Sequence, residues 1–190
     1  MFEFEQAIRN QLGIIESDDL KNISSLFHLK KFNKEEFLLK TGIRCDELFF
    51  IKSGLLRVFV YSEKREITQW IATPGYFVTD LTSFINETPA RWNFQTLTNL
   101  EILSINKENY NQVSQVIPKW NELEKRFLVN CFTTLEDRIF SHLSMSAEER
   151  YHFFFAQNKE LFNLVPLQYL ASMLGMTPET FSRIRKKLGS

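Results

Sequence analysis

The chain has 190 residues, 44% of them hydrophobic and 24% charged, and its 23 basic and 23 acidic side chains cancel. These values are typical of a globular protein with one or two cores, and they argue against a disordered chain. No run approaches the roughly 18 uncharged apolar residues of a membrane span, and no secretory signal opens the chain. We therefore expect a cytoplasmic protein with no membrane partner.

The residues that usually carry catalysis or bind metals are scattered. The cysteines Cys45 and Cys131 lie far apart, and the histidines His28, His142 and His152 form no closely spaced pair. The sequence also contains no glycine-rich phosphate loop, no GxSxG elbow and no pair of candidate catalytic carboxylates. We therefore expect no catalytic residues, no metal site, no cofactor and no enzymatic activity.

The first two thirds of the chain change from a helical to a strand pattern. Residues 1–27 have apolar side chains about once per helical turn. Residues 30–105 instead consist of short runs rich in β-branched and aromatic side chains, broken by Gly42, Gly54 and Gly75. Several short strands at regular spacing predict a β-barrel or jelly roll, with a hairpin turn in "IKSGLL".

A long helix is predicted to follow from about Pro118 to Leu143. Its apolar positions form a wide stripe, longer than a cover for the barrel needs, which fits a helix that also pairs with a second copy of itself. The residues assigned to this dimer helix are Leu123, Phe127, Leu128, Cys131 and Leu135.

Beyond it, a capping box formed by Ser146 and Glu149 predicts the start of a new helix and a domain boundary. The predicted domains are residues 1–117, a barrel with flanking helices, residues 118–145, the dimerisation helix and hinge, and residues 146–190, a DNA-binding domain.

The segment "PLQYLASMLGMTPETFSRIRKKL" predicts two short helices around Gly175. Gly175 suits the left-handed conformation that ends the first helix, and Thr177 suits the N-cap of the second. In the second helix the spacing of Phe181, Ile184 and Leu188 predicts that they face inward. The basic side chains then point outward, which is what a helix-turn-helix that reads DNA requires.

The charge of the chain is concentrated at this end. Residues 165–190 hold four basic and one acidic side chain, which leaves a slightly acidic remainder. A basic tip on a neutral protein localises a DNA contact. The alternative interpretations are that Glu179 merely complements the helix dipole and that residues 185–187 form a solvated face.

Over nearly its whole length the sequence resembles the Crp/Fnr family of bacterial transcription regulators. The resemblance rests on "FLLKTGIRCDELFFIKSGLLRVFV", on "ATPGYF", which is similar to the family's PGxF turn, and on "VPLQYLASMLGMTPETFSRIRKK". It implies an α+β fold, with an N-terminal jelly-roll barrel like that of cyclic-nucleotide-binding domains. A long dimerisation helix and a winged-helix-like helix-turn-helix domain would follow.

The resemblance also implies which residues contact DNA. In the family a Glu and an Arg four residues later read bases, and these positions are Glu179 and Arg183 here. Their chemistry suits this role, because Glu accepts from cytosine N4 and Arg binds guanine O6 and N7. A family arginine just before the Glu is replaced by Pro178. The other residues assigned to DNA, mostly to phosphates, are Thr177, Thr180, Ser182, Lys186 and Lys187.

The resemblance is weaker in the effector pocket. Where cyclic-AMP-binding members have Gly-Glu and Arg-Ser, this chain has Thr79, Asp80, Ala90 and Arg91. A buried cyclic phosphate without a cation is strongly unfavourable. The candidate pocket residues are Thr79, Asp80, Arg91 and Trp92, and the pocket could equally be blocked or bind an apolar effector.

The sequence thus predicts a homodimeric regulator that binds palindromic double-stranded DNA, without control by cyclic AMP. As an activator it would also contact RNA polymerase. Two alternatives remain open. One is a ligand-binding or protein-interaction module with a degenerate DNA-binding domain, and the other is a true cyclic-nucleotide-responsive regulator.

Overall fold

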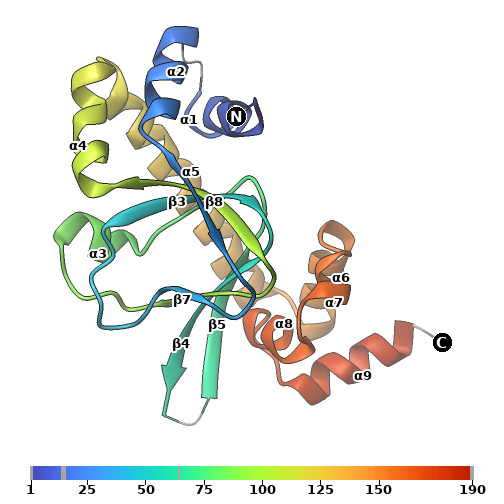
Figure 1. The fold of residues 1–190 in the computed structure, drawn as a ribbon. Coiled ribbons are helices and arrows are strands. Elements are labelled where there is room, and N and C mark those ends of the chain that lie inside the picture. The colour runs from blue at the N-terminus through green and yellow to red at the C-terminus, as the bar shows by residue number, and fades with distance from the viewer. Residues whose placement is uncertain (1, 14–15, 64, 189–190) are drawn as a thin grey trace. The chain divides into compact units, whose positions relative to one another are not determined.

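The structure is a computed structural model that describes residues 2–13, 16–63 and 65–188 (Figure 1). Its contacts group the chain into two compact units. Unit 1 comprises Met1–Val58 and Ala72–Phe132, and unit 2 comprises Phe59–Ile71 and Thr133–Ser190.

The elements follow in the order that the sequence predicts, with helices at both ends of a strand-rich region. The first half contains α1 (Phe2–Leu12), α2 (Ser17–Ser25), β1 (His28–Phe32), β2 (Phe37–Leu39), β3 (Glu47–Ser53), β4 (Leu56–Ser62), β5 (Arg65–Ala72) and β6 (Phe77–Val78). The second half contains α3 (Leu81–Asn86), β7 (Asn93–Thr96), β8 (Leu100–Asn106), α4 (Lys107–Val116), α5 (Trp120–Ser144), α6 (Ala147–Gln157), α7 (Leu161–Leu164), α8 (Leu167–Met173) and α9 (Pro178–Leu188).

The strands form two separate four-stranded sheets, ordered β1-β8-β3-β6 and β2-β7-β4-β5. This arrangement confirms the predicted jelly roll and corrects the prediction of a barrel, because no ladder joins the two sheets among the described residues. The short strands β2 and β6 explain why the two sheets do not close into a barrel. Strand β2 has three residues and a register shift against β7, and β6 has two residues.

Sheet β1-β8-β3-β6 is buried on both faces at β3. Successive side chains of a strand point to opposite faces, and Phe49 and Phe50 are 4% and 2% exposed. The Phe49 ring lies 6.3 Å from Phe94 of β7, whereas the Phe50 ring lies 4.9 Å from Phe4 of α1. The helices α1, α2 and α4 and the start of α5 therefore cover one face of this sheet and the second sheet covers the other (Figure 1).

Unit 2 contains the tip of the β4–β5 hairpin, the second half of α5 and helices α6–α9. The hairpin belongs to it because the Ser172 hydroxyl of α8 accepts a hydrogen bond from the Thr68 N–H at 2.9 Å. Helix α5 contributes residues to both units, and the boundaries at residues 117 and 145 stay predictions.

The C-terminal helices begin where the sequence predicts. Ser146 accepts from the Glu149 N–H, and the Glu149 carboxylate accepts from the Ser146 N–H, which confirms the capping box. The described residues 146–188 form helices only, so they contain no strand of the predicted wing.

Two glycines with nearly equal φ angles allow a matched test of the β3–β4 turn. Gly54 has φ +89° and a Cβ there would lie 2.3 Å from the Asn99 carbonyl oxygen, whereas Gly42 has φ +87° and nothing within 4 Å. We expect Gly42→Ala to lower the free energy of unfolding by about 1–2 kcal/mol through strain alone. Gly54→Ala should lose about 1–3 kcal/mol more through the clash. Urea denaturation measures both, and equal losses would contradict the described turn.

Candidate nucleic-acid interface

The turn between α8 and α9 is closed by a Schellman motif. Gly175 has φ +68°, the Met176 N–H donates to the Ala171 carbonyl, and the Gly175 N–H donates to the Ser172 carbonyl. Only glycine adopts this left-handed conformation without strain. The predicted role of Gly175 is confirmed, and the turn starts a new helix two residues later.

The inner face of α9 packs against an aromatic cluster. Phe181 and Ile184 are buried, as predicted, and the Leu188 side chain lies outside the described residues. The Phe181 ring lies 5.0 Å from that of Tyr151 in α6 and 5.6 Å from that of Phe162 in α7. This burial determines the rotation of α9 about its axis.

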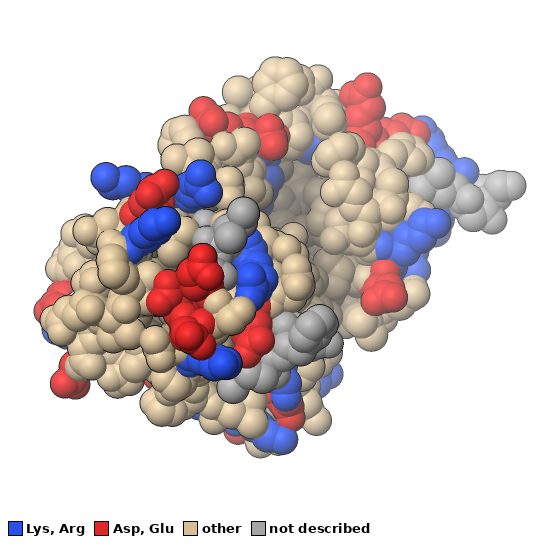
Figure 2. Space-filling model, turned by 90° about the horizontal axis from the view of Figure 1, so that it is seen from above, with Lys and Arg blue, Asp and Glu red and all other residues tan. Residues whose placement is uncertain are grey.

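The outer face of α9 brings most of the predicted DNA-binding residues together. At about 100° per residue, the arc opposite Phe181 and Ile184 spans about 140°. The residues of this arc lie side by side on one open surface of the helix, namely Glu179, Ser182, Arg183, Lys186 and Lys187. The arc holds three cations and one carboxylate. On the face seen in Figure 2, by contrast, basic and acidic side chains are interspersed.

The start of α9 is fixed by two threonines and a carboxylate. The Thr177 hydroxyl accepts from the Thr180 N–H at 3.2 Å, which confirms Thr177 as the N-cap, and it also contacts the Thr180 hydroxyl. The pKa of Glu179 is held below its ordinary value of 4.5 by hydrogen bonds, first from its own backbone N–H and then from Thr177. Glu179 is therefore ionised at neutral pH and lies at the positive end of the helix dipole.

The cations of α9 differ in their surroundings. Arg183 and Lys186 are exposed on the outer arc. Lys187 forms an exposed ion pair with Glu148 of α6 at 3.4 Å, which is weak enough to exchange for another anion. Arg185 lies toward Tyr151 and outside the arc, where its charge lowers the pKa of that tyrosine against the larger effect of burial.

Sequence reasoning missed the residues that hold the turn. Arg150 of α6 donates from Nε to the Leu174 carbonyl at 2.9 Å and from Nη1 to the Met145 carbonyl at 2.6 Å. The Arg150 guanidinium thus satisfies two backbone carbonyls, that of Leu174 at the end of α8 and that of Met145 just after α5. The sequence did not predict this role of Arg150, because its partners lie 5 and 24 residues away along the chain.

The residues predicted for a dimer helix divide between two faces of α5. Leu123 is buried and Phe127 packs on the same core, so both stabilise unit 1 itself. Leu128, Cys131 and Leu135 are exposed. The exposed apolar face also includes residues that the prediction did not assign, because it combined both faces into one stripe: Val129, Phe132, Ile139, Phe140 and Leu143.

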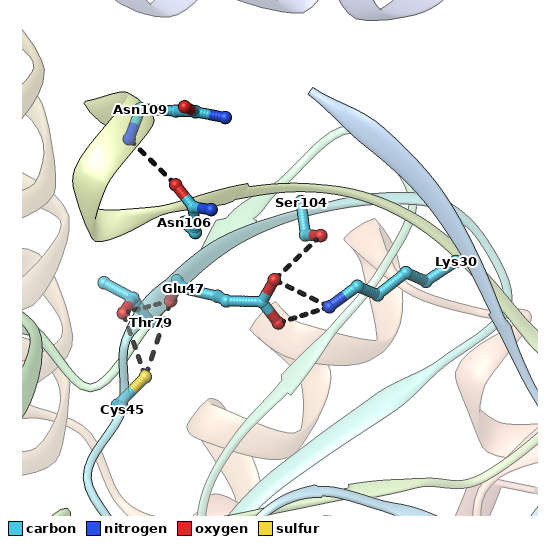
Figure 3. Close-up of polar contacts among 7 residues, drawn as sticks. All are labelled: Lys30, Cys45, Glu47, Thr79, Ser104, Asn106 and Asn109. Carbon is cyan, nitrogen blue, oxygen red and sulfur yellow. Dashed lines mark hydrogen bonds and ion pairs between the residues drawn. The ribbon is translucent and has the colours of Figure 1, made fainter. Parts of the chain in front are cut away.

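The predicted pocket residues lie in the segment around α3. The Thr79 hydroxyl donates to the Glu47 carbonyl at 3.0 Å and contacts the Cys45 sulfur at 3.4 Å (Figure 3). The Glu47 carboxylate points away from this contact, toward Lys30 and Ser104 (Figure 3). Thr79 thus serves internal hydrogen bonding.

Asp80 is buried and Arg91 is exposed. The Asp80 carboxylate accepts from the backbone N–H groups of Ser83, Arg91 and Trp92. The Arg91 guanidinium instead lies over the Trp92 ring, 5.1 Å from its centroid. The structure therefore brings Asp80, Arg91 and Trp92 together, but through the backbone, with the guanidinium outside.

A separate apolar cavity of about 40 Å³ lies in the helical layer of unit 1, lined by residues that include Ile8, Phe77 and Trp120. It is smaller than the ~150 Å³ that holds benzene. At the edge of the cavity, burial raises the pKa of Tyr110, whose hydroxyl donates to the Glu124 carboxylate.

No group of three or more potential metal ligands occurs among the described residues. None of their helices combines the length and apolar character of a membrane crossing.

Comparison with protein families identifies the strand-rich region. Residues 29–116 match the cyclic nucleotide-binding domain. The anaerobic regulatory protein of Bacillus subtilis is 28% identical over 124 residues, which are 65% of this chain and 47% of that protein. The chain thus spans about half the length of this curated relative.

Solved structures match over most of the chain. The c-di-GMP responsive global regulator CLP of Xanthomonas campestris has a TM-score of 0.71 and 18% identity, with 92% of each chain covered. FixK2 of Bradyrhizobium japonicum has a TM-score of 0.69 and 15% identity, with 86% of this chain and 84% of that chain covered. At such identities these matches show the fold.

The lowered pKa of Glu179 predicts an acid-dependent contribution to stability. A carboxyl whose pKa is lower in the folded protein stabilises it above about pH 4.5 and loses this effect as the pH falls through the folded value. We expect wild type to melt at a higher temperature than Glu179→Gln above pH 5, and the difference to disappear in acid. Thermal denaturation across pH 3–7 measures it, and a difference that stays constant would contradict the helix-capping geometry.

Proposed function

We propose that the protein is a sequence-specific DNA-binding transcription regulator of the Crp/Fnr type, because its sequence resembles that family and its elements follow the same order. The observation that carries the proposal is the outer arc of α9. An arginine, two lysines, a serine and a glutamate lie together there on one open surface, on a helix whose other face packs into an aromatic cluster. A recognition helix needs this combination of a fixed rotation and exposed cations.

The residues of the arc suit distinct contacts. Glu179 and Arg183 are four residues apart on one face, and the arginine can bind a guanine with two hydrogen bonds. Lys186 and Lys187 can neutralise phosphates on either side. The N-terminus of α9, with the Thr177 and Thr180 hydroxyls, also suits a phosphate.

We propose further that the protein acts as a homodimer through the exposed face of α5. Leu128, Phe132, Leu135 and Ile139 recur at spacings of three and four residues, the pattern of a helix that pairs with its copy. Phe132 and Ile139 are 61% and 51% exposed in the single chain. Pairing would place two recognition helices on successive major grooves of a palindromic site, about 34 Å apart.

Control by cyclic AMP is not part of this proposal. The position of the phosphate-binding arginine holds Ala90, and the neighbouring Arg91 guanidinium stacks on Trp92 at the surface. A buried phosphate would therefore have no cationic partner from this segment. DNA binding is expected without an added effector.

Selection from a random pool of DNA duplexes tests the DNA-binding function. We expect the unliganded protein to enrich a palindrome. Arg183→Ala should lose about 1–3 kcal/mol of binding free energy per half-site and relax preference at one base pair in each. Lys187→Ala is the matched control. It should weaken all sequences alike and reduce the salt slope by about 0.9 per phosphate contact. No enrichment at low salt, or an unchanged preference in Arg183→Ala, would contradict the proposal.

The dimer face has its own test. We expect Leu135→Glu to convert a dimer into a monomer, because two buried carboxylates would face each other without a partner. Sedimentation equilibrium measures the mass of each variant. Asp137→Lys, a charge change on another side of α5, is the control and should leave the dimer intact. A monomeric wild type, or a dimeric Leu135→Glu, would exclude this face as the interface.

A further inference from the structure

Asp80 joins the two ends of the α3 segment, which we define as residues 79–93. It is the N-cap of α3 and is 3% exposed. Its Oδ1 accepts from the Ser83 N–H at 3.1 Å, within the first turn of α3. Its Oδ2 accepts from the N–H groups of Arg91 and Trp92 at 2.8 and 3.2 Å, beyond the other end of the helix.

The carboxylate and its donors depend on each other energetically. A buried carboxylate ion is strongly unfavourable unless it is hydrogen-bonded, and backbone N–H groups that surround one carboxylate stabilise its charge. Without an acceptor the buried Ser83 N–H would be unsatisfied, and the Arg91 and Trp92 N–H groups would lose their partner. The charged acceptor also makes each bond stronger than one between neutral groups.

The segment is also held by an exposed ion pair between Glu87 and Arg44 at 3.2 Å and by hydrogen bonds between neutral groups. The Ser83 hydroxyl donates to the Thr88 carbonyl and accepts from the Cys45 N–H. The Ala90 N–H donates to the Ile43 carbonyl at 2.9 Å, and the Ala90 carbonyl accepts from the Gly42 N–H at 2.8 Å. These bonds tie the segment to residues 42–45 on one side, while Asp80 supplies the negative charge at its centre.

An added anion would find this position occupied. Its backbone donors are already bonded to Asp80, and its own charge would lie close to that carboxylate, which is repulsive. The nearest guanidinium of the segment, that of Arg91, lies outside on the Trp92 ring. The arrangement therefore favours the internal carboxylate over an external phosphate.

We propose that Asp80 is an internal anion of this domain, which takes the place of an anionic effector and holds the α3 segment closed in the free protein. The backbone donors of Ser83, Arg91 and Trp92 are its binding site. The inference rests on the geometry of unit 1 and not on DNA binding, so either proposal can fail while the other stands.

Chemical rescue tests this inference in the full chain. Asp80→Ala removes the acceptor and leaves space for a free carboxylate. We expect its melting temperature to fall by about 5–10 °C, because several charge-assisted hydrogen bonds are lost. Sodium formate should restore part of this loss relative to sodium chloride at equal concentration, while wild type should respond equally to both salts. Asp46→Ala is the matched control, since Asp46 is an exposed carboxylate on the neighbouring loop.

Three outcomes would overturn the proposal. They are an unchanged melting temperature in Asp80→Ala, a formate effect of equal size in wild type and variant, and stabilisation of wild type by cyclic AMP. The last would show that the segment accepts an external phosphate.

Hydrogen exchange keeps the test independent of whether Asp80→Ala folds. In wild type the amides of Ser83, Arg91 and Trp92 should exchange slowly. In Asp80→Asn the side-chain NH₂ replaces one acceptor oxygen, so either Ser83 or the Arg91–Trp92 pair should lose protection at least tenfold. Fast exchange of all three amides in wild type, or unchanged protection in Asp80→Asn, would overturn the proposal.

Discussion

The burial of Phe181 and Ile184 is the constraint on which the candidate interface depends. These two side chains fix the rotation of α9 against α6, α7 and α8, and every outward residue follows from that rotation. Ala171, which is fully buried, allows α8 to lie close to α9. A rotation of about 100° would bring a neighbour, Ile184 or Ser182 according to its direction, to the position that Arg183 now has. The aromatic cluster therefore determines which surface is available to DNA, although none of its members would touch a base.

In unit 1 the charged group at the centre of the α3 segment is the Asp80 carboxylate of the protein itself. If Asp80 acts as the proposed internal anion, this domain needs no small anion to order it. Its contribution to a regulator would then be to stabilise the first half of α5, through residues such as Trp120 and Leu123.

Local signals predicted the fold and the helix-turn-helix well. The cap at Thr177, the left-handed Gly175 and the capping box at Ser146 depend on residues within one or two turns, so the sequence contains the necessary information. The sequence analysis did not distinguish the two apolar faces of α5, because positions that face the core and positions that face solvent alternate along this helix. The opening of the sheets and the bonds of Asp80 and Arg150 were not predicted, since their partners are distant in the chain.

The hydrogen bond between Thr68 and Ser172 has a consequence for cutting the chain. It places the tip of the β4–β5 hairpin in the same compact unit as the C-terminal helices, more than one hundred residues later. Arg138 strengthens this association through the Gln69 carbonyl. A fragment that ends before α6 would keep the hairpin but lose the α8 side chain that binds it. The isolated C-terminal helices would in turn expose the Ser172 hydroxyl and its surroundings to water. If the chain is cut near residue 145, each of the two fragments should therefore be less stable than the same part within the whole chain.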